Sequence, residues 1–230
     1  MNWATLIPTL VGAGISVLTT AVMFVLNQKV QNKKELQRKE AEAALNAYVG
    51  LQKLMNTANY LFMLNKHLAT EFAEAQGAGN AEEEPALIVR EFVGAPAEIQ
   101  RVTPKDSAFL NSNSGFQLVA EIWQIESRAQ NSEAAASTFN DVKREFSQFL
   151  HSIEDGIEIA DSARLRFQLE GDDARRASVF IGQLNSLVGT LVHHLEEDTR
   201  EVKRIVNEYV AAASMKFGDR FPLQSVEWKV

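Results

Sequence analysis

The sequence from Leu10 to Glu40 reads LVGAGISVLTTAVMFVLNQKVQNKKELQRKE and joins an apolar run directly to a lysine-rich segment. Between Ala4 and Leu26 there are 23 consecutive residues without a charged side chain, and a helix needs about 20 to cross a bilayer. Residues 1–27 are therefore predicted to contain a transmembrane helix. A cleaved export signal is disfavoured, because no basic residue precedes the run and no small-residue cleavage pattern follows it.

Small side chains recur at every fourth position within the apolar run, at Gly12, Ser16 and Thr20. On a helix these residues share one face, and small side chains let two membrane helices approach closely. The pattern predicts a packing face and leaves open whether the helix self-associates or is a lone anchor. The run has no ionisable side chain, which argues against a proton relay or an ion site within it.

Basic residues gather directly after the apolar run, and we call this group the basic collar: Lys29, Lys33, Lys34, Arg38 and Lys39. The amino end of the run offers no basic side chain. The positive-inside rule then places the bulk of the chain in the cytoplasm and the amino terminus outside a bacterial inner membrane. The collar can also attract anionic headgroups, at about 1 kcal/mol per side chain, so the lipid bilayer is the first predicted partner.

Charge and composition exclude several other classes of protein. Residues 41–230 carry 18 basic and 28 acidic side chains, a balance of −10. A nucleic-acid binder needs an excess of positive charge against phosphate, so neither DNA nor RNA is an expected partner. The chain has no cysteine, which excludes disulfides, thiolate metal sites and cysteine nucleophiles.

No proline follows Leu26 until Pro85, and Gly50 is the only glycine inside the intervening pattern. Apolar residues there keep a 3-4 spacing, which is a heptad repeat: Ala44, Ala47, Leu51, Leu54, Ala58, Leu61, Asn65, Leu68 and Phe72. The sequence predicts one long stalk helix over residues 28–76 that begins with the basic collar. Asn65 is a polar residue in this predicted seam, where an asparagine can fix helix register.

Glycine and proline interrupt the pattern over residues 77–114, where we expect an irregular segment with short helices, one of them over 85–93. Two more heptad seams predict two long antiparallel helices and their connection within residues 115–216. Part of that connection, ARLRFQLE, fits either a short helix or an extended piece. The predicted fold class is all-α, with a transmembrane helix continuing into the stalk and an antiparallel bundle of three long helices plus short ones.

One dense cluster of possible metal ligands lies in the last of these helices: His193, His194, Glu196, Glu197 and Asp198. Bundle di-metal sites place a glutamate three residues before a histidine and repeat the pattern on a second helix. The order is reversed here, so we expect a solvated polar face, with Asp198 as a polar residue in the seam. We expect no metal, no cofactor and no catalytic site, because the chain also lacks the G-x-S-x-G, H-E-x-x-H and phosphate-loop motifs.

The carboxyl-terminal segment, residues 217–230, is apolar for a chain end and contains Phe221, Leu223 and Trp228. It is expected to pack back on the bundle, and the alternative is a docking peptide for a partner protein. Its last residues, SVEWKV, alternate as a short strand would.

These features predict a single-pass membrane-anchored helical scaffold or sensor that acts through protein contacts and assembly and has no enzymatic activity. Its expected partners are the bilayer, further copies of itself and a cytoplasmic protein. The first alternative is an oligomeric membrane effector that forms a pore or perturbs the bilayer, as a component of a bacterial stress or antiviral system. The second is a metal-binding or enzymatic bundle that uses His194 and Asp198.

Overall fold

The computed structural model describes residues 3–80, 82–93, 99–111, 113–153, 157–161, 164–167, 169–223 and 225–228. For residues 3–22, 25, 113–114 and the two strands it describes the backbone alone. Three long helices dominate the fold: α1 (Trp3–Gly77), α3 (Asn113–His151) and α4 (Gly171–Phe217). The shorter elements are α2 (Pro85–Ile88), the 3-10 helices η1 (Ala108–Leu110) and η2 (Gly218–Arg220), and an antiparallel hairpin of β1 (Ile157–Asp161) and β2 (Arg164–Phe167).

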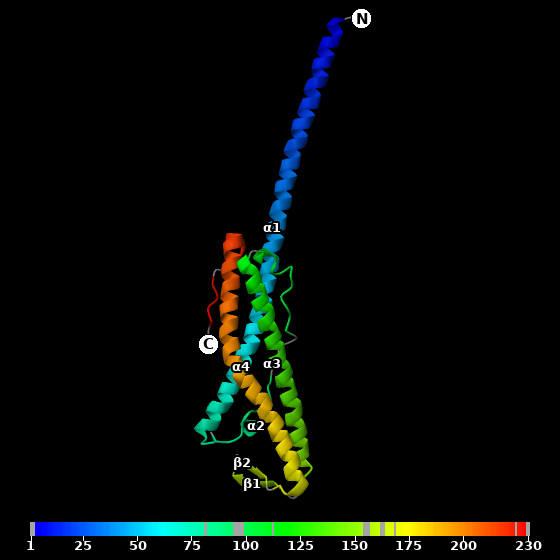
Figure 1. Ribbon diagram of the computed structural model, residues 1–230. Coiled ribbons are helices and arrows are strands. Elements are labelled where there is room, and N and C mark those ends of the chain that lie inside the picture. Colours follow the sequence, from blue (N-terminus) through cyan, green and yellow to red (C-terminus); the bar gives the residue numbers. More distant parts are fainter. Residues whose placement is uncertain are drawn as a thin grey trace.

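The predicted helical bundle is confirmed, and the hairpin shows that the undecided connection is extended. Helix α4 runs antiparallel to both other long helices, so α1 and α3 run in the same direction (Figure 1). On α1 and α4, Tyr209 lies beside Ala47 while Lys203 lies over the ring of Phe62. The irregular segment between Gly77 and Asn113, residues 78–112, which we call the return segment, therefore has to lead the chain back along the bundle before α3 can begin.

One half of α1 stands outside the bundle (Figure 1). Every described side chain over residues 26–42 is exposed, and we call this part the rod. Buried positions begin at Ala44 and continue along the predicted seam to Leu61. At 1.5 Å per residue the rod is roughly 25 Å long, and it separates the bundle from the amino-terminal part of α1.

No helix among the described residues contains a stretch long and apolar enough to cross a membrane. The side chains of residues 3–22 lie outside the described ones. The predicted packing face of Gly12, Ser16 and Thr20 is among them, so its packing is not described.

The seam of α1 departs from the prediction after Leu61. The next buried positions are Leu64, Leu68 and Glu71, while Asn65 is only half-buried. The prediction that Asn65 lies in the seam is therefore wrong, and Leu64 occupies the seam at this point. The reason is geometric, because α1 diverges from α3 and α4 below this point (Figure 1) and turns a different face toward the chain that follows α2.

Helix α2 ends at Ile88, well before the predicted end at residue 93, because side chains hold the following residues in an extended path. Arg90 donates to both carboxylate oxygens of Glu71, at 2.8 and 2.9 Å. Asn140 on α3 forms two hydrogen bonds with the backbone of Phe92, as donor at 2.9 Å and as acceptor at 2.8 Å. Side-chain contacts replace helical hydrogen bonds in this part of the return segment.

Candidate functional site

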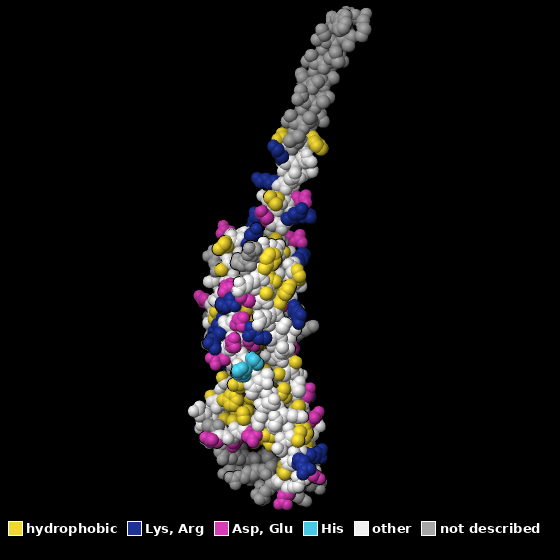
Figure 2. Space-filling model, viewed as in Figure 1, with side chains coloured by type: hydrophobic (Ala, Val, Ile, Leu, Met, Phe, Trp, Pro, Cys, Tyr) yellow, Lys and Arg dark blue, Asp and Glu magenta, His cyan; other side chains and the backbone are white. Residues whose placement is uncertain are grey.

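The basic collar lies entirely on the rod, and all five of its side chains are exposed. Figure 2 shows Lys and Arg side chains at both edges of this part of α1 in the view drawn. Within the collar Lys39 forms an ion pair with Glu35, at 2.8 Å. Four apolar side chains at the amino end of the described surface are exposed as well: Met23, Phe24, Leu26 and Val30. The collar therefore offers positive charge to any surface that surrounds the rod.

The predicted polar cluster on α4 does not converge into a metal site. His193, His194 and Glu197 are exposed, whereas Asp198, one turn after His194, is fully buried and faces Arg128 of α3. The two histidine rings contact each other edge to face, with centroids 4.7 Å apart. Within the described part of the chain, no group of three or more His, Asp or Glu side chains could hold a metal ion.

Asp198 is a partner of Arg128 on α3, a pairing that the sequence did not indicate. Nη1 of Arg128 donates to Oδ1 of Asp198 at 2.7 Å, and its Nη2 pairs with Glu201 one turn further along. The second carboxylate oxygen of Asp198 and Nε of Arg128 are buried and form no hydrogen bond with the residues that the structure describes. Burial raises the pKa of Asp198 although the Arg128 charge opposes the shift. This ion pair fixes the register of α3 against α4.

A second buried carboxylate, Glu126, holds the return segment onto α3. Its Oε1 accepts a hydrogen bond from the backbone N–H of Val102 at 2.7 Å, and its Oε2 has no hydrogen-bond partner in the described part of the chain. Nearby, Lys53 on α1 pairs with Asp106 at 2.7 Å, and Asp106 also accepts two hydrogen bonds from Thr103. Residues 104–107 form a turn, and the Lys53–Asp106 ion pair ties this turn to α1.

We expect the stability of the bundle to depend on the protonation of Glu126. Burial raises the pKa of Glu126 to about 7, with Asp106 adding to the shift and the Val102 N–H, Arg101 and Lys53 opposing it. A carboxyl group with a raised pKa binds more protons in the folded chain, so stability falls as pH rises from about 4.5 to about 7. The loss should be on the order of 3 kcal/mol, measured by thermal unfolding across this range.

Glu126→Gln should remove that part of the pH dependence and make the chain more stable than the wild type above neutral pH. The exposed Glu145 on the same helix provides the matched control. Glu145→Gln should leave the pH dependence unchanged, and an unaltered profile for Glu126→Gln would refute the assignment.

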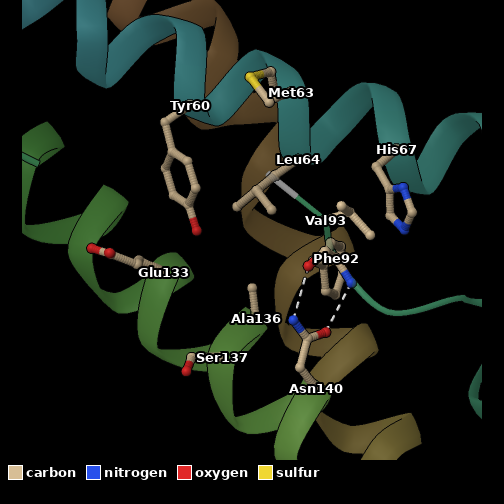
Figure 3. Close-up of a pocket in the computed structure, with 10 residues that line it drawn as sticks. All are labelled: Tyr60, Met63, Leu64, His67, Phe92, Val93, Glu133, Ala136, Ser137 and Asn140. Carbon is tan, nitrogen blue, oxygen red and sulfur yellow. Dashed lines mark hydrogen bonds between the residues drawn. The ribbon is translucent and has the colours of Figure 1, made fainter. Parts of the chain in front are cut away.

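A pocket of about 170 Å³ lies between α1, α3 and the return segment. Ten side chains line it (Figure 3): Tyr60, Met63, Leu64, His67, Phe92, Val93, Glu133, Ala136, Ser137 and Asn140. Leu64 and Ala136 are buried and form an apolar floor. The rings of His67 and Phe92 contact each other, with centroids 4.9 Å apart. The paired hydrogen bonds of Asn140 hold Phe92 in place against α3 (Figure 3).

The carboxyl-terminal segment packs back along α1 and α4 in an irregular conformation and not as a strand. Phe221 is buried, Leu223 accepts a hydrogen bond from Ser214 through its backbone carbonyl at 2.8 Å, and Trp228 packs against the Phe62 ring at 5.3 Å. Nε1 of Trp228 donates to Asn207 at 3.3 Å. Phe221 and Trp228 therefore pack against other residues of the same chain.

Sequence reasoning missed both the pocket and the two buried carboxylate contacts. Glu126 follows directly after the seam residue Ile125, and an acidic side chain beside a seam position is a signal that could have been followed. The pocket gave no such signal, because its three walls are distant in sequence.

The comparisons add no relative whose properties could be transferred to these sites. No protein-family model, no curated protein and no solved structure matched the chain.

Proposed function

We propose that this protein is a single-pass membrane-anchored helical scaffold or sensor that acts through protein contacts and assembly and not through catalysis. The observation that carries the proposal is the continuity of α1, which runs as one helix from Trp3 to Gly77 through an exposed rod into the bundle. In the proposal the uncharged residues 4–26 cross a bacterial inner membrane, with the amino terminus outside and the bundle in the cytoplasm.

The charge distribution supports this arrangement. The collar is exposed around the rod, directly after the uncharged residues, where lysines can meet anionic headgroups. The bundle that follows the collar in the chain is acidic. This charge suits contact with a basic protein surface in the cytoplasm and disfavours binding to nucleic acid.

The test is the location of the full chain in a bacterial cell. We expect the wild type in the inner-membrane fraction, resistant to carbonate extraction, because an apolar helix leaves the bilayer only at a large cost. Replacing Ile15 and Val17 by lysine should move the chain to the supernatant, since each charge at the centre of a span costs about 3 kcal/mol.

The control places the same two charges where the structure shows exposed apolar side chains, at Val179 and Val192 on α4. That variant should stay in the membrane fraction. A wild-type chain that is extracted by carbonate would contradict the proposed anchor.

A second candidate function, an oligomeric membrane effector, is favoured by the exposed apolar side chains of α1 just before and within the start of the rod. Met23, Leu26 and Val30 follow a 3-4 spacing and are exposed in the single chain, as a parallel association of several helices would require. Substituting leucine at Gly12 and Ser16 should abolish this activity, because close backbone approach is lost. A scaffold should tolerate the same change, so retained activity of the double variant would remove the effector.

A further inference from the structure

The pocket between α1, α3 and the return segment is lined by a tyrosine hydroxyl that has no hydrogen-bond partner among the described residues. Tyr60 is 3% exposed, and its hydroxyl forms no hydrogen bond with any residue that the structure describes. Figure 3 shows this side chain extending from α1 toward α3, with its oxygen at the α3 side of the pocket. A tyrosine hydroxyl both donates and accepts hydrogen bonds, so the pocket is suited to a molecule that forms a hydrogen bond at this position.

The charge at the same end of the pocket is negative. Glu133 lines the pocket close enough to Tyr60 to raise the pKa of that hydroxyl, although burial is the larger cause. Within the described part of the chain Glu133 has no ion pair, unlike Glu71 and Glu126, whose carboxylates are engaged by Arg90 and Val102. His67 on the opposite side is engaged by the Arg90 carbonyl at 3.2 Å. An anionic ligand would therefore be repelled and a cation attracted.

The remaining walls suit a compact apolar body. Leu64 and Ala136 form the floor, and the rings of Tyr60, Phe92 and His67 surround it. Aromatic faces attract organic cations as well as apolar groups. A protein cavity of about 150 Å³ accommodates benzene, so a pocket of about 170 Å³ fits a ligand of similar size with a short polar extension.

We propose that this pocket binds a small organic amine, with the ammonium group between Tyr60 and Glu133 and the apolar body on Leu64 and Ala136. The ammonium donates to the Tyr60 oxygen and to the Glu133 carboxylate, which completes the hydrogen bonding of both. This site is remote from the rod and does not depend on the proposed membrane anchor. It gives the bundle a ligand whose binding draws α1, α3 and the return segment together.

The test is calorimetric titration of the full chain in mild detergent with benzylamine, which is charged at neutral pH, and with benzyl alcohol, which has the same shape and no charge. A molecule of this size should bind with a dissociation constant of about 1 mM. Benzyl alcohol should bind roughly tenfold more weakly, because it lacks the charge-assisted hydrogen bonds.

Three variants assign the contacts. Glu133→Gln should weaken benzylamine about tenfold and leave benzyl alcohol unchanged, and Tyr60→Phe should weaken the amine about fivefold. Ala136→Leu should abolish binding of both probes by filling the floor. The matched control, Glu145→Gln, removes the same charge from an exposed position of α3 outside the pocket and should change nothing.

Either of two results would overturn the proposal. One is the absence of saturable benzylamine binding to the wild type. The other is equal affinity for the amine and the alcohol, or an amine affinity that Glu133→Gln does not change, since the site would then be an apolar cavity without selection for charge. Glu133 and Glu145 are not core residues, so both glutamine variants should fold, and a thermal unfolding curve for each confirms it.

Discussion

Arg128→Met should lower the free energy of unfolding by about 3–5 kcal/mol, because it leaves a buried carboxylate without its counter-charge. Asp198 is 0% exposed, and one of its oxygens already forms no hydrogen bond with any described residue. Without Arg128, Asp198 must stay charged in an apolar environment or take up a proton, so the loss should increase with pH. Thermal unfolding followed by circular dichroism measures the effect on the full chain in mild detergent.

Two controls make this result specific to burial. Arg144→Met removes the partner of Asp141 in an exposed ion pair, and it should cost less than about 0.5 kcal/mol. The double variant Arg128→Met with Asp198→Leu removes both buried charges and should recover most of the loss. A cost for Arg128→Met no greater than that for Arg144→Met would show that Asp198 is not desolvated in solution.

Gly50→Ala should cost about 2–4 kcal/mol, because the packing of α1 at this position leaves no room for a methyl group. An added Cβ would lie 2.3 Å from the Tyr209 hydroxyl oxygen and 2.9 Å from Cβ of Asp106. The Tyr209 hydroxyl is buried between the backbone carbonyls of Ala47 and Asp106, at 2.9 and 2.8 Å. The variant therefore displaces a buried hydrogen bond in addition to crowding the core, and its cost is read from the same unfolding curves.

Gly189→Ala is the matched control, since no atom of the described residues lies within 4 Å of the position its Cβ would take. This change in an exposed turn of α4 should stabilise the chain by up to about 1 kcal/mol through helix propensity. Adding Tyr209→Phe to Gly50→Ala removes the closest atom and should recover part of the loss. Equal effects of Gly50→Ala and Gly189→Ala would contradict the close approach.

The sequence predicts the three long helices well, because each must bury a stripe of apolar residues that repeats with the helical period. On α3 the stripe looks interrupted only because Ser132 occupies a seam position, where it is buried between Ala129 and Ala136. The relative direction of α1 and α3 was not predictable in the same way. A heptad specifies that a face is buried, and not which helix buries it or how the intervening chain returns.

Charged side chains explain why the candidate sites were harder to predict than the helices. Asp198 stands out as a polar residue in a seam, but its partner Arg128 lies 70 residues away on another helix. The pocket is similar, because Tyr60, Phe92 and Asn140 come together only after the return segment has been laid along the bundle. Local periodicity contains no information on such contacts, which depend on tertiary packing.

Because α1 is one continuous helix, the rod is rigidly connected to the part of α1 that packs in the bundle. The bundle packs around residues 44–68 of α1. The rod, which precedes them in the chain, contains neither glycine nor proline at which it could bend independently. If α1 rotates by one residue within the bundle, the rod turns with it by about 100°. Torque and axial displacement should therefore be transmitted along the rod with little loss, so the two ends of the rod cannot change orientation separately.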